Sequence, residues 1–245
     1  GVIEGRNAVV EALRAGVIID KIFIMKGETD ATLGHIASTA REKGIVVVDA
    51  DRRKLDGMSR THAHQGVIAL AAMREYVSVE DILEKAAEKG EKPLIVICDE
   101  LSDPHNLGAI IRTAEAAGAH GVIIPKRRGV GLTATVAKTS AGAVEYMPVV
   151  RVANIVSCID ELKEQGFWIF CADMDGETWC QADMKGKIGV VVGSEGFGVS
   201  RLTKEHCDFV VSLPMKGHVN SLNASVAAGI IIYEAVRQRN DIRAK

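Results

Sequence analysis

Short apolar runs alternate with longer amphipathic segments through the second half of the chain. Runs of four or five apolar residues predict buried strands, and apolar positions that recur every three or four residues between them predict helices. The predicted strands are 94–98, 121–124, 146–149, 167–171, 188–192 and 209–213, and the predicted helices are 106–117, 133–141, 155–165, 200–206 and 221–239. Strands that alternate with helices through short loops are typical of an α/β domain with a mainly parallel sheet.

The first half carries a smaller pattern of the same kind. Its predicted helices are 7–15, 29–43 and 52–58, and its predicted strands are 21–25, 45–49 and 66–71. The segment 76–92 that follows is rich in charges of both signs, which is typical of a solvated connecting helix. We therefore expect a small α/β domain at 1–75, a linker at 76–92 and a larger α/β domain at 93–245.

The charge balance limits how nucleic acid could be bound. The 245 residues hold 30 Lys and Arg against 32 Asp and Glu, for a formal net charge of −2. Any contact with phosphates must therefore be local rather than driven by bulk positive charge. Phe, Trp and Tyr make up 4% of the chain, so a stacking platform for single strands is not expected. Two basic runs, Lys126–Arg128 and Arg52–Lys54, fit either phosphate contact or a solvated surface.

The cysteines and histidines indicate neither a disulfide framework nor a metal site. The five cysteines, an odd number, include no C-x-x-C pair, which favours a reducing compartment. The seven histidines show no metal-ligand spacing, so no metal is expected. The longest apolar stretch, 225–236, is too short to span a bilayer, and no signal peptide is recognisable. We expect a cytoplasmic protein whose chain, beginning at Gly1, lacks a few native residues.

Polar residues and glycines gather in the loops that follow three predicted strands, where open α/β sheets bind ligands. After the strand 94–98, Asn106 is of a helix-capping type and Arg112 falls in the second turn of the helix. An ion pair between Arg112 and Glu115, three residues further on, fits the same sequence. This loop alone therefore does not establish a functional site.

The second loop follows a buried strand and is rich in glycine. Gly193, Gly196 and Gly198 form a G-x-x-G-x-G sequence with Glu195 inside it. Glycines at such a turn allow positive φ and let a ligand lie against the backbone. The dinucleotide fingerprint G-x-G-x-x-G is absent, and 211–214 contains no acidic residue, which argues against an oxidoreductase.

The third loop leads from the last strand into the last helix. Ser221 and Asn223 are both capping residue types, and they flank Leu222. Beyond them the helix is apolar nearly all round, from Val226 to Val236. A helix of this kind is buried on more than one side, which indicates a subunit interface.

Together the three loops resemble the motifs of the SpoU (TrmH-type) RNA ribose 2′-O-methyltransferases of the SPOUT class. The matching sequences, in the family's order over residues 94–239, are N-x5-R, G-S-E-G-x-G and L-P-M followed by S-L-N-x-S-V-A. The opening G-R-N-A-V-x-E-A-L and the later H-Q-G-V resemble the family's small substrate-binding domain, itself similar to RNA-binding ribosomal proteins. That domain accompanies the bacterial enzyme that methylates 23S rRNA, whereas tRNA-modifying relatives usually lack it, so the resemblance favours rRNA over tRNA.

The resemblance implies an enzyme that transfers a methyl group from S-adenosyl-L-methionine (AdoMet) to the ribose 2′-hydroxyl of a guanosine in 23S rRNA. It also implies a deep trefoil knot in the second α/β domain and a homodimer. The residues that match the family's catalytic positions are Arg112, Asn106, Glu195, Ser221 and Asn223. Those that match its AdoMet contacts are Gly193, Gly196, Leu213, Met215 and Leu222. RNA contacts are expected from Arg6, Asn7, Lys126, Arg127 and Arg128.

Two roles remain open for Arg112 in activating the ribose hydroxyl. An arginine base is physically awkward, because the pKa of a guanidinium exceeds ~12. A permanent cation more readily clamps the adjacent phosphate or stabilises the negative charge that develops on the oxygen. Either role requires Arg112 to reach the RNA.

Other activities stay open at this point. Within the family, a tRNA guanosine 2′-O-methyltransferase is the alternative to an rRNA enzyme. Outside the family, a non-catalytic RNA-binding module would account for the first domain. Such a module would need neither Arg112 nor Asn106 nor the glycine loop.

Overall fold

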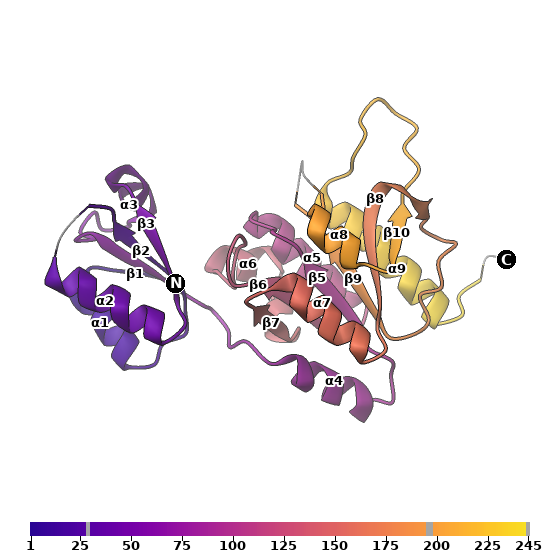
Figure 1. Cartoon of the computed structure of the whole chain (residues 1–245), viewed down its shortest axis with the longest axis horizontal. Helices are drawn as coiled ribbons and strands as arrows, with labels where there is room; N and C mark the ends of the chain where they lie inside the picture. Colours follow the sequence, from indigo (N-terminus) through magenta and orange to yellow (C-terminus); the bar gives the residue numbers. More distant parts are fainter. Residues whose placement is uncertain (28–29, 195–197, 244–245) are drawn as a thin grey trace. The chain divides into compact units, whose positions relative to one another are not determined.

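The computed structural model describes residues 1–27, 30–194 and 198–243, and the chain divides into two compact units (Figure 1). The first unit holds Gly1–Glu75 with Gly131–Ala134, and the second holds Tyr76–Val130 with Thr135–Lys245. Each unit contains one sheet with helices packed on it. The expected α/β fold class is therefore confirmed.

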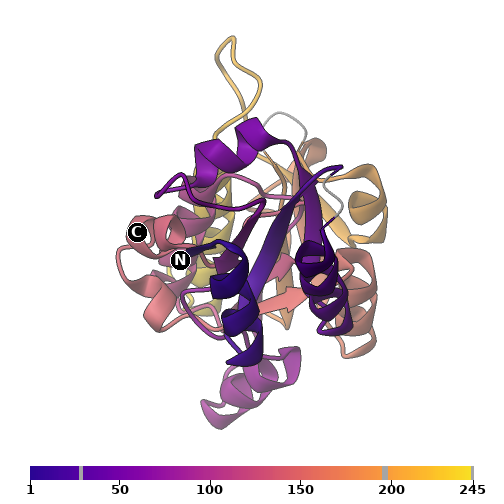
Figure 2. The same cartoon turned by 90° about the vertical axis from the view of Figure 1, so that its left-hand side faces the viewer.

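The first unit is a mixed four-stranded sheet with helices on both faces (Figure 2). Its strands β2 and β3 run parallel, whereas the β1–β4 and β4–β2 pairs are antiparallel. The strands, in the spatial order β1-β4-β2-β3, are β1 (Val2–Glu4), β2 (Ile19–Met25), β3 (Val46–Ala50) and β4 (Val67–Ala71). The helices are α1 (Arg6–Arg14), α2 (Ala31–Glu42) and α3 (Arg52–Met58).

Successive residues of β2 face opposite sides of this sheet, because a strand alternates its side chains. Ile22 and Ile24 pack in one core with α1 and α2, whereas Phe23 packs in a second core with Leu55 of α3. The sequence pattern does not predict β1, because three residues are too few to show an alternation.

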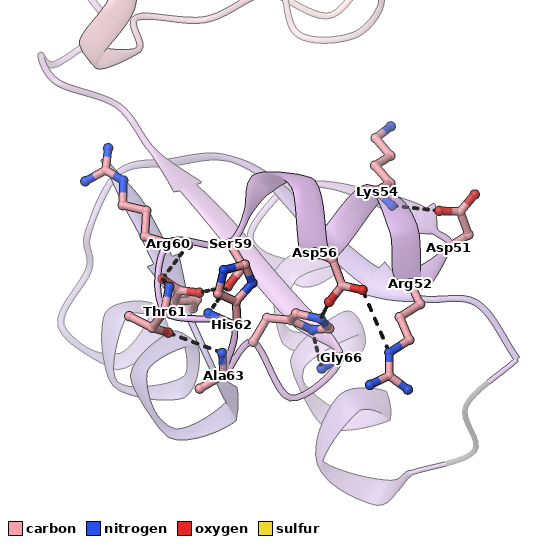
Figure 3. A network of polar contacts seen from close by, with 12 residues as sticks. Asp51, Arg52, Lys54, Asp56, Ser59, Arg60, Thr61, His62, Ala63 and Gly66 are labelled. Atoms are coloured by element: carbon pink, nitrogen blue, oxygen red, sulfur yellow. Dashed lines mark hydrogen bonds and ion pairs between the residues drawn. The ribbon is translucent and has the colours of Figure 1, made fainter.

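The loop between α3 and β4 is held by the carboxylate of Glu4, the last residue of β1 (Figure 3). This carboxylate accepts the hydroxyl of Ser59 and the backbone N–H groups of Arg60 and Thr61, the latter two at 3.1 Å. The Ser59 hydroxyl accepts in turn from the N–H of His62 at 2.8 Å. These bonds favour the charged carboxylate and lower the pKa of Glu4, with the Ser59 bond as the largest cause.

The second unit is a six-stranded parallel sheet in the order β10-β8-β9-β5-β6-β7, which confirms the expected parallel arrangement. Its strands are β5 (Leu94–Cys98), β6 (Gly121–Pro125), β7 (Val149–Val152), β8 (Trp168–Thr178), β9 (Ile188–Val192) and β10 (Phe209–Ser212). The helices of this half are α4 (Val79–Glu88), α5 (Pro104–Ala116), α6 (Ala134–Thr139), α7 (Ile155–Glu164), α8 (Arg201–His206) and α9 (Ala224–Arg239).

The centre of this sheet is formed by β5 and β9, whose residues are all buried. On one face, Ile95 and Ile97 of β5 share a core with α4 and α7. Helices α5 and α9 pack against each other on the other face (Figure 1). The sheet is thus covered on both sides, as parallel sheets require.

Helix α4 is not the wholly solvated connector that its charges suggest. Its Ile82 and Ala86 are fully buried, and Ile82 belongs to the core of the second unit. A Cβ on Gly121 would lie 2.0 Å from Cδ1 of Ile82, so the glycine at the start of β6 makes room for this side chain. The prediction of a solvated helix is wrong for the face that carries Ile82 and Ala86, because a local charge pattern does not show a packing partner that is distant in sequence.

Two strands differ from their predicted bounds. The strand expected at 146–149 begins only at Val149, because Ala143–Glu145 forms a 3-10 helix and Pro148 has no N–H for the sheet ladder. The strand expected at 167–171 continues to Thr178. Its polar end pairs with β10 through Glu177 and Thr178, beyond a shift in register.

Every helix in the described ranges is too short or too polar to cross a membrane. In the same ranges, His, Cys, Asp and Glu side chains do not gather in groups of three or more that could hold a metal ion.

Replacing Glu4 by Gln should destabilise the first unit at neutral pH, because the loop loses a charged acceptor. The pKa of Glu4 is lower in the folded state than its ordinary value. Its contribution is therefore present above the unfolded-state pKa and is lost as the pH falls through the folded-state pKa. Urea midpoints of wild type and Glu4→Gln should differ at pH 7 and converge once the pH falls below the folded-state pKa of Glu4. A difference of equal size at both pH values would contradict this role.

Candidate functional site

A cavity of about 530 Å³ opens at the carboxyl ends of β9 and β10, beside the middle of β8 and with α9 along one side. Ligands of open α/β sheets bind at this edge, and the volume falls within the range of roughly 300–1,000 Å³ that is usual for small-molecule sites. The cavity lining brings together several of the expected site residues: Gly193, Leu213, Met215, Ser221, Leu222 and Asn223.

The turn after β9 forms one wall of the cavity. The N–H of Ser194 donates to the carbonyl of Gly198 at 3.1 Å, and the N–H of Gly198 donates back to the carbonyl of Ser194 at 2.9 Å. A Cβ on Gly193 would lie 2.0 Å from the carbonyl carbon of Gly198, and Gly198 itself has a φ of +65°. The turn therefore requires glycine at both positions. Two other expected site residues, Glu195 and Gly196, lie outside the described residues.

Asn223 caps α9 and links it to a distant helix. Its Oδ1 accepts from the N–H of Ser225 at 2.9 Å and from the N–H of Val226 at 3.3 Å. Its Nδ2 donates to Oδ1 of Asn106 at 3.0 Å. The prediction that the helix begins at Ser221 is therefore wrong: because Asn223 occupies the cap, α9 begins at Ala224 and Ser221 stays in the preceding loop.

Asn106 lies inside α5 and does not cap it as predicted. The cap is Asp103, whose carboxylate accepts from the N–H of His105 at 2.8 Å, and Pro104 takes the first helical position. Proline fits there because the first N–H of a helix has no partner within the helix. The Asn106 side chain is consequently free of a capping role, is 3% exposed, and reaches Asn223. This contact joins the first turn of α5, which follows β5, to the start of α9, which follows β10.

Arg112 lies one and a half turns beyond Asn106 on α5 and is exposed. Within the described part of the chain it makes no hydrogen bond or ion pair, so the pairing with Glu115 that the sequence allows is not present. Arg112 is also not among the described residues that line the cavity. Its guanidinium is thus available to a partner outside the described residues.

A buried carboxylate that sequence reasoning missed holds the glycine turn to β5. Asp99 follows β5 directly and is 4% exposed. Its Oδ2 accepts from the N–H of Ser200 at 2.8 Å, at the point where the turn leads into α8. A buried charge is tolerated when it is hydrogen-bonded, and here the bond fixes the far end of the turn.

A second missed carboxylate belongs to the cavity itself. Asp173 lies in β8 just beyond the buried residue Cys171, and it lines the cavity. Its Oδ2 accepts from Nζ of Lys204 in α8 at 2.8 Å, and this bond is the largest cause of a lowered pKa for Asp173. An acidic residue at the carboxyl end of a predicted strand is the signal that could have identified it.

The basic run after β6 lies outside the cavity lining. Arg128 pairs with Glu100, its Nη1 lying 3.2 Å from Oε1. Arg127 is exposed, and Lys126 is half-buried. The side chains of Arg128 and Glu100 are 80% and 44% exposed. An exposed ion pair is weak, so it reduces the attraction of the basic run for phosphate only a little.

In the first unit, Arg6 ties the start of α1 to its neighbours. Its Nη1 lies 2.6 Å from Oδ2 of Asp30, and its Nε donates to the carbonyl of Gln65 at 3.0 Å. Asn7, the other residue expected to contact RNA there, is exposed. Arg6 therefore has a structural role in this unit that the sequence pattern did not indicate.

Apolar side chains remain exposed along one stripe of α9. Val226, Ile230 and Tyr233 are 51%, 37% and 48% exposed, and their spacing puts them on one side of the helix. Leu222, just before the helix, is 41% exposed. An apolar stripe of this kind is unusual on a surface that meets water only.

Two family models match the chain, one in each half. The SpoU rRNA Methylase family matches residues 93–233, and the family described as RNA 2′-O ribose methyltransferase substrate binding matches residues 2–77. The Bacillus subtilis protein YacO, named among TrmH family tRNA/rRNA methyltransferases, is 46% identical over 239 residues. The match covers 97% of this chain and 96% of YacO.

Two solved structures are similar along most of their length. The SpoU methyltransferase AviRb from Streptomyces viridochromogenes, crystallised with its cofactor AdoMet, superposes with a TM-score of 0.62 at 26% identity. The match covers 98% of this chain and 90% of AviRb. The A. aeolicus TrmH/SpoU tRNA modifying enzyme superposes with a TM-score of 0.56 at 32% identity, over 66% of this chain and 84% of that enzyme.

The two roles of Asn223 can be separated by substitution. Asn223→Ala removes both the cap and the bond to Asn106, whereas Asn223→Ser keeps a capping oxygen and removes only the bond. Loss of a cap costs about 1 kcal/mol, so we expect Asn223→Ala to lower the free energy of unfolding more than Asn223→Ser does. Denaturant unfolding measures both. Equal losses would show that the cap contributes nothing at this position.

Proposed function

The chain belongs to the SpoU/TrmH family of RNA ribose 2′-O-methyltransferases, which use AdoMet, and we propose that it methylates a guanosine of 23S rRNA. This is the activity of the bacterial enzyme called RlmB. The observation that carries the proposal is the cavity at the ends of β9 and β10 and beside β8, together with the Asn106–Asn223 contact. Arg112 is the residue we assign to hydroxyl activation.

The cavity fits the cofactor in its size and its chemistry. The glycine turn lines it without a side chain at Gly193, because a Cβ there would collide with the backbone of Gly198. Leu213, Met215 and Leu222 supply apolar surface against which an adenine ring can pack. We propose that these residues hold AdoMet, with Gly196 of the same turn as a further contact. Bound there, the cofactor supplies a methyl group on a positively charged sulfur.

The protein must make the ribose hydroxyl reactive, because a sugar hydroxyl is almost wholly protonated at neutral pH. A permanent guanidinium at Arg112 can stabilise the negative charge that develops on this oxygen, or hold the adjacent phosphate. Its exposure and its lack of a partner among the described residues support a role toward RNA. Asn106 and Asn223 orient the RNA beside it through amide donors and acceptors. Ser221 and Glu195 complete the proposed catalytic set.

The first unit supports the choice of an rRNA substrate. It matches a substrate-binding family over its length, whereas the tRNA modifying enzyme of A. aeolicus matches only 66% of this chain. We propose that Asn7, together with Arg6, contacts RNA in the first unit, and that Lys126, Arg127 and Arg128 contact phosphates in the second. The five cysteines form no disulfide, which supports a reducing cytoplasm as the compartment.

The exposed stripe of α9 supports a homodimer. Val226, Ile230 and Tyr233 offer an apolar surface that a second copy of the chain would bury. Helix α5 packs beside α9, with Cγ2 of Thr113 3.7 Å from the Cβ position of Gly229. Arg112, the neighbour of Thr113, would therefore lie close to the partner subunit.

Ribose-methylation mapping tests the proposed function and the role of Arg112 together. Purified wild type and Arg112→Ala are incubated with AdoMet and either 23S rRNA or bulk tRNA. We expect the wild type to methylate a guanosine of the rRNA. We expect Arg112→Ala to lower kcat by about 100-fold or more, the usual effect of removing a group that stabilises developing charge.

The affinity of each protein for AdoMet serves as the control. Because Arg112 does not line the cavity, calorimetry should give nearly the same Kd for Arg112→Ala and wild type. An affinity that collapses with the activity would make Arg112 a cofactor or folding residue. Methylation of tRNA with none of rRNA would replace the proposed substrate by the tRNA alternative.

A further inference from the structure

One charged residue lines a cavity whose other described lining residues are uncharged. That residue is Asp173, which lies in the middle of β8, the strand that pairs with β9 and therefore neighbours the strand that leads into the glycine turn. Phe170 and Cys171, earlier in the same strand, are fully buried in the sheet. Asp173 is thus the first acidic residue of this strand, and its backbone is fixed by the sheet.

The Asp173 carboxylate is held in place before any ligand binds. Its Oδ2 accepts from Nζ of Lys204 at 2.8 Å, and its Oδ1 accepts from the N–H of Met174 at 2.6 Å. The Lys204 bond lowers the pKa of Asp173 and keeps the carboxylate ionised at neutral pH. An ionised carboxylate can accept about four hydrogen bonds, so Asp173 retains acceptor capacity toward the cavity.

The ion pair also determines which ligand group suits this wall. Lys204 balances the charge of Asp173, so a cation such as a sulfonium gains little net attraction here. A neutral hydroxyl donor gains a charge-assisted hydrogen bond without needing net charge on the wall. Acidic side chains that follow a strand are a known means of binding ribose hydroxyls in nucleotide sites.

We propose that Asp173 accepts a hydrogen bond from a ribose hydroxyl of AdoMet, and that it makes the cavity specific for a ribonucleoside. Lys204 acts as a positioning residue for the carboxylate. This inference rests on the proposed function, because it requires AdoMet in this cavity.

Calorimetry with S-adenosylhomocysteine and its 2′-deoxy and 3′-deoxy analogues tests the proposal. For the wild type, loss of the hydroxyl that Asp173 binds should weaken affinity by about 10- to 100-fold, the usual worth of a hydrogen bond to a charged group. Asp173→Ala should bind S-adenosylhomocysteine more weakly by a similar factor. Asp173→Ala should also bind S-adenosylhomocysteine and the analogue that lacks this hydroxyl with the same affinity. Asp175→Ala is the matched control, because Asp175 is exposed on the same strand and is not part of the cavity lining.

Lys204→Met distinguishes a contact between Asp173 and the ligand from the ion pair by which Asp173 links β8 to α8. This variant breaks the same ion pair but leaves the carboxylate, so it should bind S-adenosylhomocysteine more weakly than wild type, because the carboxylate is less firmly positioned, and should still bind the deoxy analogue more weakly than S-adenosylhomocysteine. If Asp173→Ala keeps that sensitivity, the proposal is wrong. It is also wrong if Asp173→Ala loses affinity for AdoMet but not for S-adenosylhomocysteine, since Asp173 would then face the sulfonium. Failure of the wild type to bind AdoMet would instead refute the proposed function.

Discussion

At the end of β9 the backbone folds back on itself with no space for a side chain. The Cβ that any other residue would place at position 193 falls 2.0 Å from the carbonyl carbon of Gly198, well inside the contact distance of two carbon atoms. Two backbone hydrogen bonds between Ser194 and Gly198 hold the turn closed. This turn lines the cavity together with residues of β8, β10 and α9.

The other parts of the site are fixed by a series of polar contacts that start from this turn. The buried carboxylate of Asp99 accepts from Ser200 and holds the turn's far end to the central strand β5. Ser200 leads into α8, which carries Lys204 to Asp173 on β8. On the other side, Asn223 begins α9 and reaches Asn106 of α5. Elements far apart in sequence therefore position one another around a single cavity.

Much of this arrangement could be predicted from the sequence, and the reasons for the rest are physical. The bounds of β5 and β9 agree with prediction because both strands are continuous apolar runs buried on two faces. Gly193 and Asn223, which the motifs predicted for the site, both line the cavity. Asp173 was not, because its place in the cavity depends on the strand order β10-β8-β9, which no local pattern shows. Burial of Ile82 against Gly121 was missed for the same reason.

A calorimetric titration of AdoMet into Gly193→Ala tests most directly whether the turn at Gly193 forms the AdoMet site. Gly186→Ala is the matched control, because a Cβ on Gly186 would meet only Cδ1 of Trp168, at an ordinary 3.8 Å. We expect Gly193→Ala, checked by near-ultraviolet circular dichroism to be folded, to bind AdoMet at least about tenfold more weakly than wild type, since overpacking shifts the backbone. Gly186→Ala should bind like wild type. Undiminished binding by Gly193→Ala would show that this turn does not form the AdoMet site.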